Sequence, residues 1–188
     1  MVKAKLRKEY KGLSDQELLN KAYEFGFAYE KYSWSCSQCT VAALHELLDI
    51  DDVVVRVSTS ICGGTADQTL GTCGALAGGI IALDCYFGRP LEKMSRREYI
   101  QANIDALNPG SEVSQLLADK FVKEYGTFIC GQLQRKLFGR IFCFTEGDGT
   151  EKWLEAGAHS ATDKCCHLVG NAARWTLEIL LDKGVVSL

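Results

Sequence analysis

The side chains most able to do chemistry in this sequence are its nine cysteines, in a chain of 188 residues. Capping residues and the apolar spacing that follows them place four cysteines in the first turn of a predicted helix: Cys36, Cys73, Cys130 and Cys165. At a helix start, unpaired N–H groups and the positive end of the helix dipole favour an anion. We therefore expect these thiols to have a lowered pKa and more thiolate, the form that attacks electrophiles and binds metals.

The same four cysteines lie on the apolar stripes of their predicted helices, as Cys165 does with Leu168, Val169 and Ala172. Side chains on such stripes point inward, so the four thiols can converge. Four converging thiolates suit an iron–sulfur cluster of the 2Fe–2S or 4Fe–4S type. They also suit tetrahedral zinc. For any one of these thiols, the alternative is a place in the core as a small buried hydrophobe.

Three more cysteines could add a ligand or act as resolving thiols: Cys39, Cys62 and Cys143. Cys39 forms a C-x-x-C pair with Cys36, but Thr40 stands where covalent haem attachment requires histidine, so no covalent haem is expected. Cys85 and Cys166 are interpreted as structural. No residue is assigned a catalytic role, and the sequence leaves open whether the chain is an oxidoreductase or an electron carrier.

The composition is that of an ordinary globular protein, with 47% hydrophobic and 24% charged residues. The net charge of −3 gives no reason to expect nucleic acid as a partner. The longest apolar run, Cys73 to Leu83, is shorter than the roughly 20 residues that a membrane span needs, so no membrane partner is expected. The first residues lack the apolar core of a signal peptide. We expect a cytoplasmic protein, in which thiols stay reduced.

Helical spacing and capping signals predict an all-α chain with a single compact domain over residues 1–188, of which 1–13 form an N-terminal extension. Two strand-like runs, Asp51–Ile61 and Arg140–Phe144, make at best one ribbon, so we predict helix for the first and loop for the second. Residues 144–160 are predicted as loop with one turn around Trp153. We expect seven or eight helices, over about 15–31, 35–48, 51–61, 73–87, 95–108, 111–125, 127–137 and 162–183.

Three glycines inside the apolar helix predicted over 73–87 need a reason, because Gly costs up to about 1 kcal/mol relative to Ala there. Close approach of another helix, or of a cofactor, would account for Gly74, Gly78 and Gly79. The preceding stretch from Gly63 to Gly71 is a weak candidate for a phosphate-binding loop, since no lysine follows its glycines in P-loop spacing.

The segments that hold the four helix-start cysteines resemble a known family: Cys36-Ser37-Gln38, Gly71-Thr72-Cys73-Gly74-Ala75-Leu76-Ala77-Gly78, Cys130-Gly131-Gln132-Leu133 and Lys164-Cys165-Cys166-His167-Leu168-Val169. From about Leu18 to Leu181, the chain is similar to the C_GCAxxG_C_C family of redox-active proteins. That family is similar to part of the split-Soret cytochromes c, helical homodimers that hold haem and an iron–sulfur centre. The resemblance implies an all-α fold, a homodimer, redox chemistry and a cluster bound by the family cysteines, here Cys36, Cys73, Cys130 and Cys165.

Three hypotheses follow for the function. The leading one is electron transfer through a cysteine-ligated iron–sulfur cluster, with a redox partner protein that the sequence does not identify. The second is a metal-free redox protein, in which one thiol attacks a disulfide or oxidant and a neighbour such as Cys39 resolves it. The third is a structural zinc-binding protein, for which only Cys36 and Cys39 have typical ligand spacing.

Overall fold

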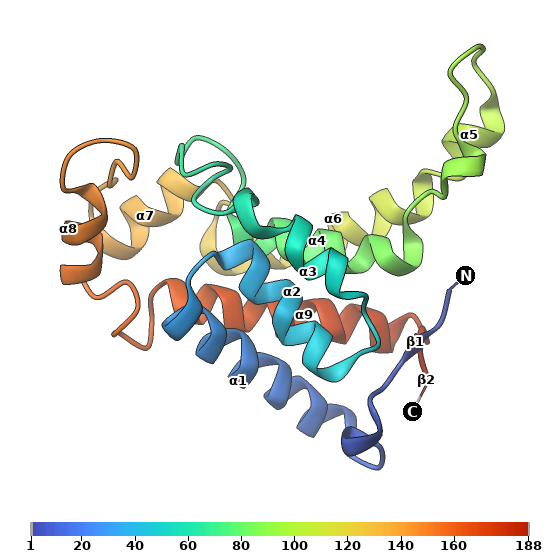
Figure 1. The fold of residues 1–188 in the computed structure, drawn as a ribbon, viewed down its shortest axis with the longest axis horizontal. Helices are drawn as coiled ribbons and strands as arrows, with labels where there is room; N and C mark the ends of the chain where they lie inside the picture. Colours follow the sequence, from blue (N-terminus) through green and yellow to red (C-terminus); the bar gives the residue numbers. More distant parts are fainter. Residues whose placement is uncertain (1, 188) are drawn as a thin grey trace.

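Helix α9 (Cys165–Asp182) lies at the centre of the fold in the computed structural model, which describes residues 2–187 (Figure 1). It packs against four other long helices: α1 (Asp15–Ser33), α2 (Cys36–Leu47), α4 (Gly74–Phe87) and α6 (Asn108–Tyr125). Most of its side chains are buried, including Leu168, Leu177 and Leu180. The core is therefore built from the apolar faces of several helices around one buried helix.

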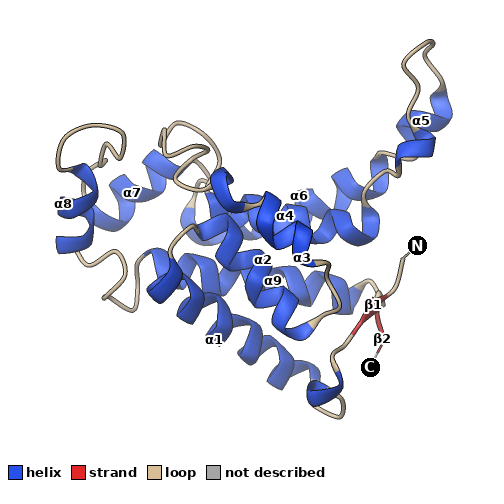
Figure 2. Cartoon of the chain, in the orientation of Figure 1, coloured by secondary structure: helices blue, strands red, loops and turns tan. Residues whose placement is uncertain are grey.

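Shorter elements complete the fold, and helices dominate it (Figure 2). In chain order these are β1 (Ala4–Lys5), the 3-10 turn η1 (Lys8–Tyr10), α3 (Asp52–Val57), η2 (Thr59–Ile61), η3 (Leu91–Lys93), α5 (Gln101–Asp105), α7 (Cys130–Phe138), α8 (Gly149–Glu155) and β2 (Val186–Ser187). The all-α class predicted from the sequence is confirmed. Among residues 2–187, no helix is both long enough and apolar enough to span a membrane.

The two ends of the described chain lie together (Figure 1), because β1 pairs in parallel with β2 and places Ala4 opposite Val186. Ala4 and Leu6 are buried. Leu6 also forms an antiparallel bridge with Leu48, just after α2. Within the residues predicted as an N-terminal extension, Ala4 and Leu6 are thus packed against the helical core.

Several predicted helix starts are confirmed, and α1 is the clearest. The Ser14 N–H donates to Glu17 Oε2 over 2.8 Å, and the Glu17 N–H donates to Ser14 Oγ over 3.4 Å, which completes a capping box. The valine-rich run predicted as helix contains α3, where the Asp51 side chain accepts the Val53 N–H over 2.9 Å. Residues 140–144 are irregular, as predicted.

The helix predicted over 95–108 is wrong at both ends. Ser95 Oγ accepts the N–H groups of Arg97 and Glu98, but residues 96–100 are not helical and α5 begins only at Gln101. These residues form the exposed tip of an arm that projects beside α5 (Figure 1), where no apolar face supports a helix. The turn predicted at 108–110 instead begins α6, because Pro109 is tolerated in a first helical turn.

Two boundaries near the C-terminal helix also differ from the prediction. The single turn expected around Trp153 is a helix of seven residues, α8. Its Trp153 indole packs edge-on against Phe144, with ring centroids 5.0 Å apart, which gives this short helix tertiary support. Lys164 is the N-cap of α9, and neither Thr162 nor Asp163 caps that helix.

Close packing of α4 against α2 explains one of the three glycines inside the helix predicted over 73–87. A Cβ atom on Gly78 would overlap the carbonyl oxygen of Ser37 and would lie 2.9 Å from Cβ of Thr40. Both neighbours belong to α2, and Thr40 is fully buried. A side chain at position 78 would therefore force the two helices apart.

We predict that Gly78→Ala lowers the free energy of unfolding by about 2 kcal/mol, since the added methyl overpacks the contact between α2 and α4. The higher helix propensity of alanine offsets about 1 kcal/mol of the steric cost of the added methyl group, which is larger. Denaturant unfolding monitored by circular dichroism measures the change. Gly139→Ala is the control, because Gly139 has φ of 74° but no atom of the described chain near an added Cβ. An equal or smaller loss for Gly78→Ala than for Gly139→Ala would contradict this account.

Candidate functional site

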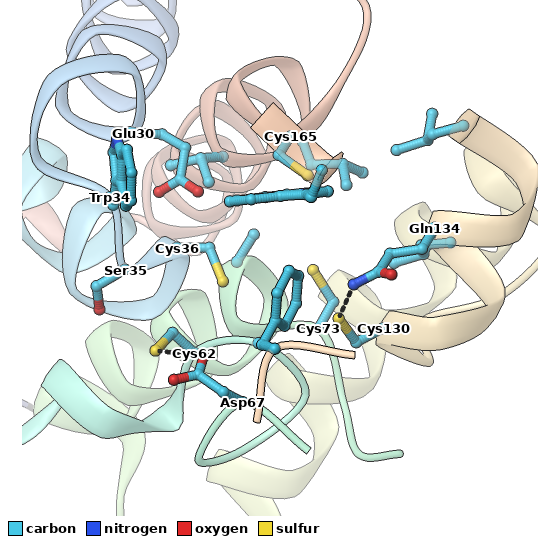
Figure 3. A pocket seen from close by; sticks show the side chains of 18 of the residues that line it. Glu30, Trp34, Ser35, Cys36, Cys62, Asp67, Cys73, Cys130, Gln134 and Cys165 are labelled. Atoms are coloured by element: carbon cyan, nitrogen blue, oxygen red, sulfur yellow. Dashed lines mark hydrogen bonds between the residues drawn. The ribbon is translucent and has the colours of Figure 1, made fainter. Parts of the chain in front are cut away.

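A cavity of about 250 Å³ lies where the N-terminal ends of α2, α4, α7 and α9 meet (Figure 3). All four cysteines that the sequence places at helix starts line it: Cys36, Cys73, Cys130 and Cys165. Three are the first residues of their helices, and Cys73 is the residue just before α4. The structure thus brings these four side chains together, while their role as ligands stays a prediction.

An antiparallel bridge between Thr72 and Ile129 joins the chain just before α4 to the chain just before α7. The N–H of Cys73 donates to a backbone carbonyl in the segment just before α7 over 2.8 Å. In return, the N–H of Cys130 donates to a backbone carbonyl in the segment just before α4 over 2.9 Å. This reciprocal pair of bonds holds two of the four thiols next to each other.

A sharp reversal between α1 and α2 positions the third thiol. Trp34 and Ser35 both have a positive φ, of 63° and 61°, and Ser35 is in the left-handed region. Ser35 Oγ donates to the carbonyl of Thr59 over 2.7 Å, which holds the reversal against η2. Cys36 then lies so close to α4 that a Cβ on Gly74 would overlap its sulfur. Gly74 is therefore glycine because a thiol occupies the space of its side chain.

The start of α9 is held against the end of α7 by Lys164. Its Nζ donates to the carbonyl of Leu137 over 2.5 Å and lies 5.5 Å from the centroid of the Phe138 ring. In the described chain, no side chain caps α2, α4, α7 or α9. The N–H groups at these four helix starts are consequently not used by capping side chains.

Most of the remaining cavity wall is apolar or aromatic: Leu133, Leu137, Phe144, Trp153, Leu168 and Val169. Gln134 is a polar exception, and its Nε2 donates to the sulfur of Cys130 over 3.7 Å (Figure 3). A wall of this kind keeps bulk water away and strengthens the electrostatic interactions inside.

The other candidate cysteines differ in position. Cys62 also lines the cavity, with its sulfur 3.6 Å from Asp67 Oδ1 (Figure 3). Cys39 is buried and donates to the carbonyl of Trp34. Cys143 is exposed in the loop before α8. Cys85 and Cys166, the two cysteines interpreted as structural, each donate to a backbone carbonyl.

The loop after Cys62 has a strained backbone. Thr65, Ala66 and Asp67 are consecutive non-glycine residues with φ of 71°, 49° and 60°. Each such residue costs on the order of 1 to 2 kcal/mol. The Asp67 N–H donates to the carbonyl of Cys62 over 3.3 Å, so the turn folds back and aims the Asp67 carboxylate at the Cys62 thiol.

The predicted low pKa of the helix-start thiols is wrong for three of them. A hydrogen bond with Cys73 and burial together raise the pKa of Cys36 well above its usual value. Burial raises the pKa of Cys130 to about 12 and that of Cys165 well above its usual value. Desolvation can shift a pKa by about 3 to 5 units, which exceeds the effect of a helix dipole. These thiols are therefore protonated at neutral pH unless a cation lies beside them.

Among the cavity residues that sequence reasoning misses is Glu30, whose side chain is only 3% exposed. The signal is present in the spacing, since Leu18, Ala22, Gly26 and Glu30 recur every four residues along the buried face of α1. A charged residue on such a face is rarely buried unless it is paired. The partner here is His159, with Nε2 3.3 Å from Glu30 Oε1.

Exposed Cys143 contrasts with the cavity thiols, because a hydrogen bond with Thr145 lowers its pKa. We predict that iodoacetamide modifies Cys143 of the metal-free chain near pH 7 on the order of tenfold faster than the cavity thiols. Peptide mass spectrometry measures the rates. Because burial raises the pKa of Cys130 to about 12, its labelling should increase only as the pH rises well above 8. Cys143→Ser should remove the fast phase, and faster labelling of Cys36 or Cys165 would refute the prediction.

Comparison with known proteins adds one finding. The family described as "Putative redox-active protein (C_GCAxxG_C_C)" matches residues 34–179. This range contains all four helix-start cysteines and begins later than the resemblance noted from about Leu18. Neither the curated proteins nor the solved structures gave a match. Because the match covers most of the chain and its cysteine-bearing segments, this protein belongs to the C_GCAxxG_C_C family of redox-active proteins.

Proposed function

We propose that the chain binds an iron–sulfur cluster through Cys36, Cys73, Cys130 and Cys165 and exchanges electrons with a partner protein. One observation carries the proposal: four thiols from four separate helix starts line a single cavity. Four cysteine thiolates are the usual ligand set of such clusters. Membership in a redox-active family supports the same class of chemistry.

The electrostatics of the cavity fit this group. Burial keeps Cys130 and Cys165 protonated at neutral pH, so the thiolates need cationic iron beside them. N–H groups at the starts of α2 and α9 that no capping side chain uses can donate to thiolate sulfur. Such hydrogen bonds and the degree of burial set the reduction potential of a bound cluster.

The positions of the side chains favour a polynuclear group over the structural zinc alternative. Within residues 2–187, no three His, Cys, Asp or Glu side chains are close enough together to hold a single metal ion. A structural zinc site requires four ligands at one point. A cluster instead spreads its thiolates over different iron atoms, and when bound it supplies one-electron redox chemistry.

The chain itself holds and shields the site. The cysteines would bind the cluster, the apolar wall limits the access of water, and Gln134 donates a hydrogen bond to the sulfur of Cys130. Trp34 lines the cavity and is also 42% exposed, so it extends from the site to the surface. We propose this surface as the place where the redox partner protein approaches.

A thiol–disulfide couple is the second candidate, and one contact favours it: the hydrogen bond between the Cys36 and Cys73 thiols. Oxidation would join the two sulfurs, release two protons and pass two electrons to a disulfide or peroxide. The raised pKa of Cys36 makes its thiolate scarce at neutral pH, so this reaction should be slow. Loss of two free thiols from metal-free protein on mild oxidation would support this candidate instead.

We predict that protein purified without oxygen is brown, contains iron and sulfide, and loses visible absorbance on reduction. Cys73→Ser should abolish bound iron, because it removes a ligand at the start of α4. Cys85→Ser is the matched control on the same helix and should retain iron, since Cys85 donates to the Ile81 carbonyl instead. Iron and sulfide analysis with absorbance spectra measures both.

Three results would contradict the cluster proposal. Anaerobic wild-type protein without iron would refute it directly. Colourless protein with stoichiometric zinc would support the structural alternative. Loss of iron from Cys85→Ser with retention in Cys73→Ser would show that the ligand set is wrong. Circular dichroism of each variant separates loss of metal from loss of the fold.

A further inference from the structure

Glu30 contributes an unpaired, buried oxygen to the cavity. Its side chain is 3% exposed, and Oε2 has no hydrogen-bond partner in the described chain. Figure 3 shows Glu30, which belongs to α1, among the side chains that line the cavity with Cys36 and Cys165. Burying such an oxygen without a partner is costly, so its place on this wall calls for a reason beyond packing. Glu30 also lies outside the residues that match the family, so the family does not assign it a role.

His159 lies next to the carboxylate. Its Nε2 is 3.3 Å from Glu30 Oε1, its side chain is 7% exposed, and neither ring nitrogen has a hydrogen-bond partner in the described chain. The imidazole ring contacts two indoles, with centroids 5.1 Å from Trp34 and 4.6 Å from Trp153. Glu30 and Trp153 line the cavity, so the pair presents its acidic end to the site.

Glu30 faces the same cavity as thiols from two helices. Its side chain lines the wall together with Cys36 at the start of α2 and Cys165 at the start of α9. Any charged group bound by these thiols would therefore share one poorly hydrated space with the carboxylate.

We propose that Glu30, buried in the cavity wall next to His159, is a fixed negative charge that lowers the reduction potential of the redox centre in this cavity. The inference rests on the proposed function. A fixed negative charge in a poorly screened site opposes the arrival of an electron, because a low effective dielectric leaves the Coulomb repulsion strong. Net charge near the centre is one of the factors that set cluster potentials. Glu30 therefore acts through its charge on the reduction potential and is not itself a ligand.

The test is a potentiometric titration of anaerobically prepared wild-type protein and Glu30→Gln at one fixed pH. Dithionite supplies the one electron of each reduction, and no bond of Glu30 forms or breaks. We expect the potential of Glu30→Gln to rise by an amount that makes reduction about tenfold more favourable, or about 59 mV for one electron. Glu30→Asp keeps the charge and should stay close to wild type.

Glu46→Gln is the matched control, because it removes the same charge from the same half of the molecule. Glu46 accepts a hydrogen bond from Tyr29 over 2.5 Å and is not part of the cavity wall in the described chain. We expect its potential to equal that of the wild type. A shift as large as that of Glu30→Gln would show a general charge effect and overturn the inference.

The remaining outcomes separate this inference from the proposed function. Iron-loaded Glu30→Gln with an unchanged potential overturns the inference and leaves the cluster proposal standing. Wild-type protein without iron refutes the cluster proposal, and the inference fails with it. If Glu30→Gln and Glu30→Ala both fold but hold no iron while Glu30→Asp is loaded, Glu30 is a ligand and the tuning role is overturned.

Discussion

Burial of the thiols is the physical constraint on which the site depends. Four helix N-termini converge on one cavity, and their dipoles favour negative charge there. Desolvation opposes that charge more strongly, and it raises the pKa of Cys130 to about 12. The site is consequently a set of protonated thiols until a cation lies among them. The raised pKa makes these cysteines poor nucleophiles at neutral pH. They are still well placed as metal ligands, because a bound cation can replace the thiol proton without exposing the sulfur to water.

Irregular segments, and not the helices themselves, bring the thiols together. The bridge between Thr72 and Ile129 joins two helix starts, and the reversal at Trp34 and Ser35 turns a third towards them. The loop at 63–69 adds several left-handed residues next to Cys62. Strain of this kind persists only where the surrounding structure over-determines it, and it concentrates at functional sites. The buried helix α9 and its neighbours supply that rigid surrounding.

Prediction from the sequence succeeded where a capping signal preceded an apolar stripe, as at Ser14 and Glu17 before α1. It failed at Ser95, which has the same signal, because the following residues form an exposed arm with nothing to pack against. The break predicted between 95–108 and 111–125 leaves Pro109 outside a helix, whereas it stands in the first turn of α6, since proline is compatible with both places. The extent of α8 depends on the contact between Trp153 and Phe144, which no local signal contains.

The sequence by itself determined which cysteines stand at helix starts, because capping and apolar periodicity act within a few residues along the chain. Only the tertiary structure decided what those positions mean. It showed that four separate starts share one cavity, that burial reverses the expected thiol pKa, and that Glu30 and His159 belong to the same site. The physical reason is that burial and Coulomb interactions depend on distances in space, whereas spacing along the chain reports only the local conformation.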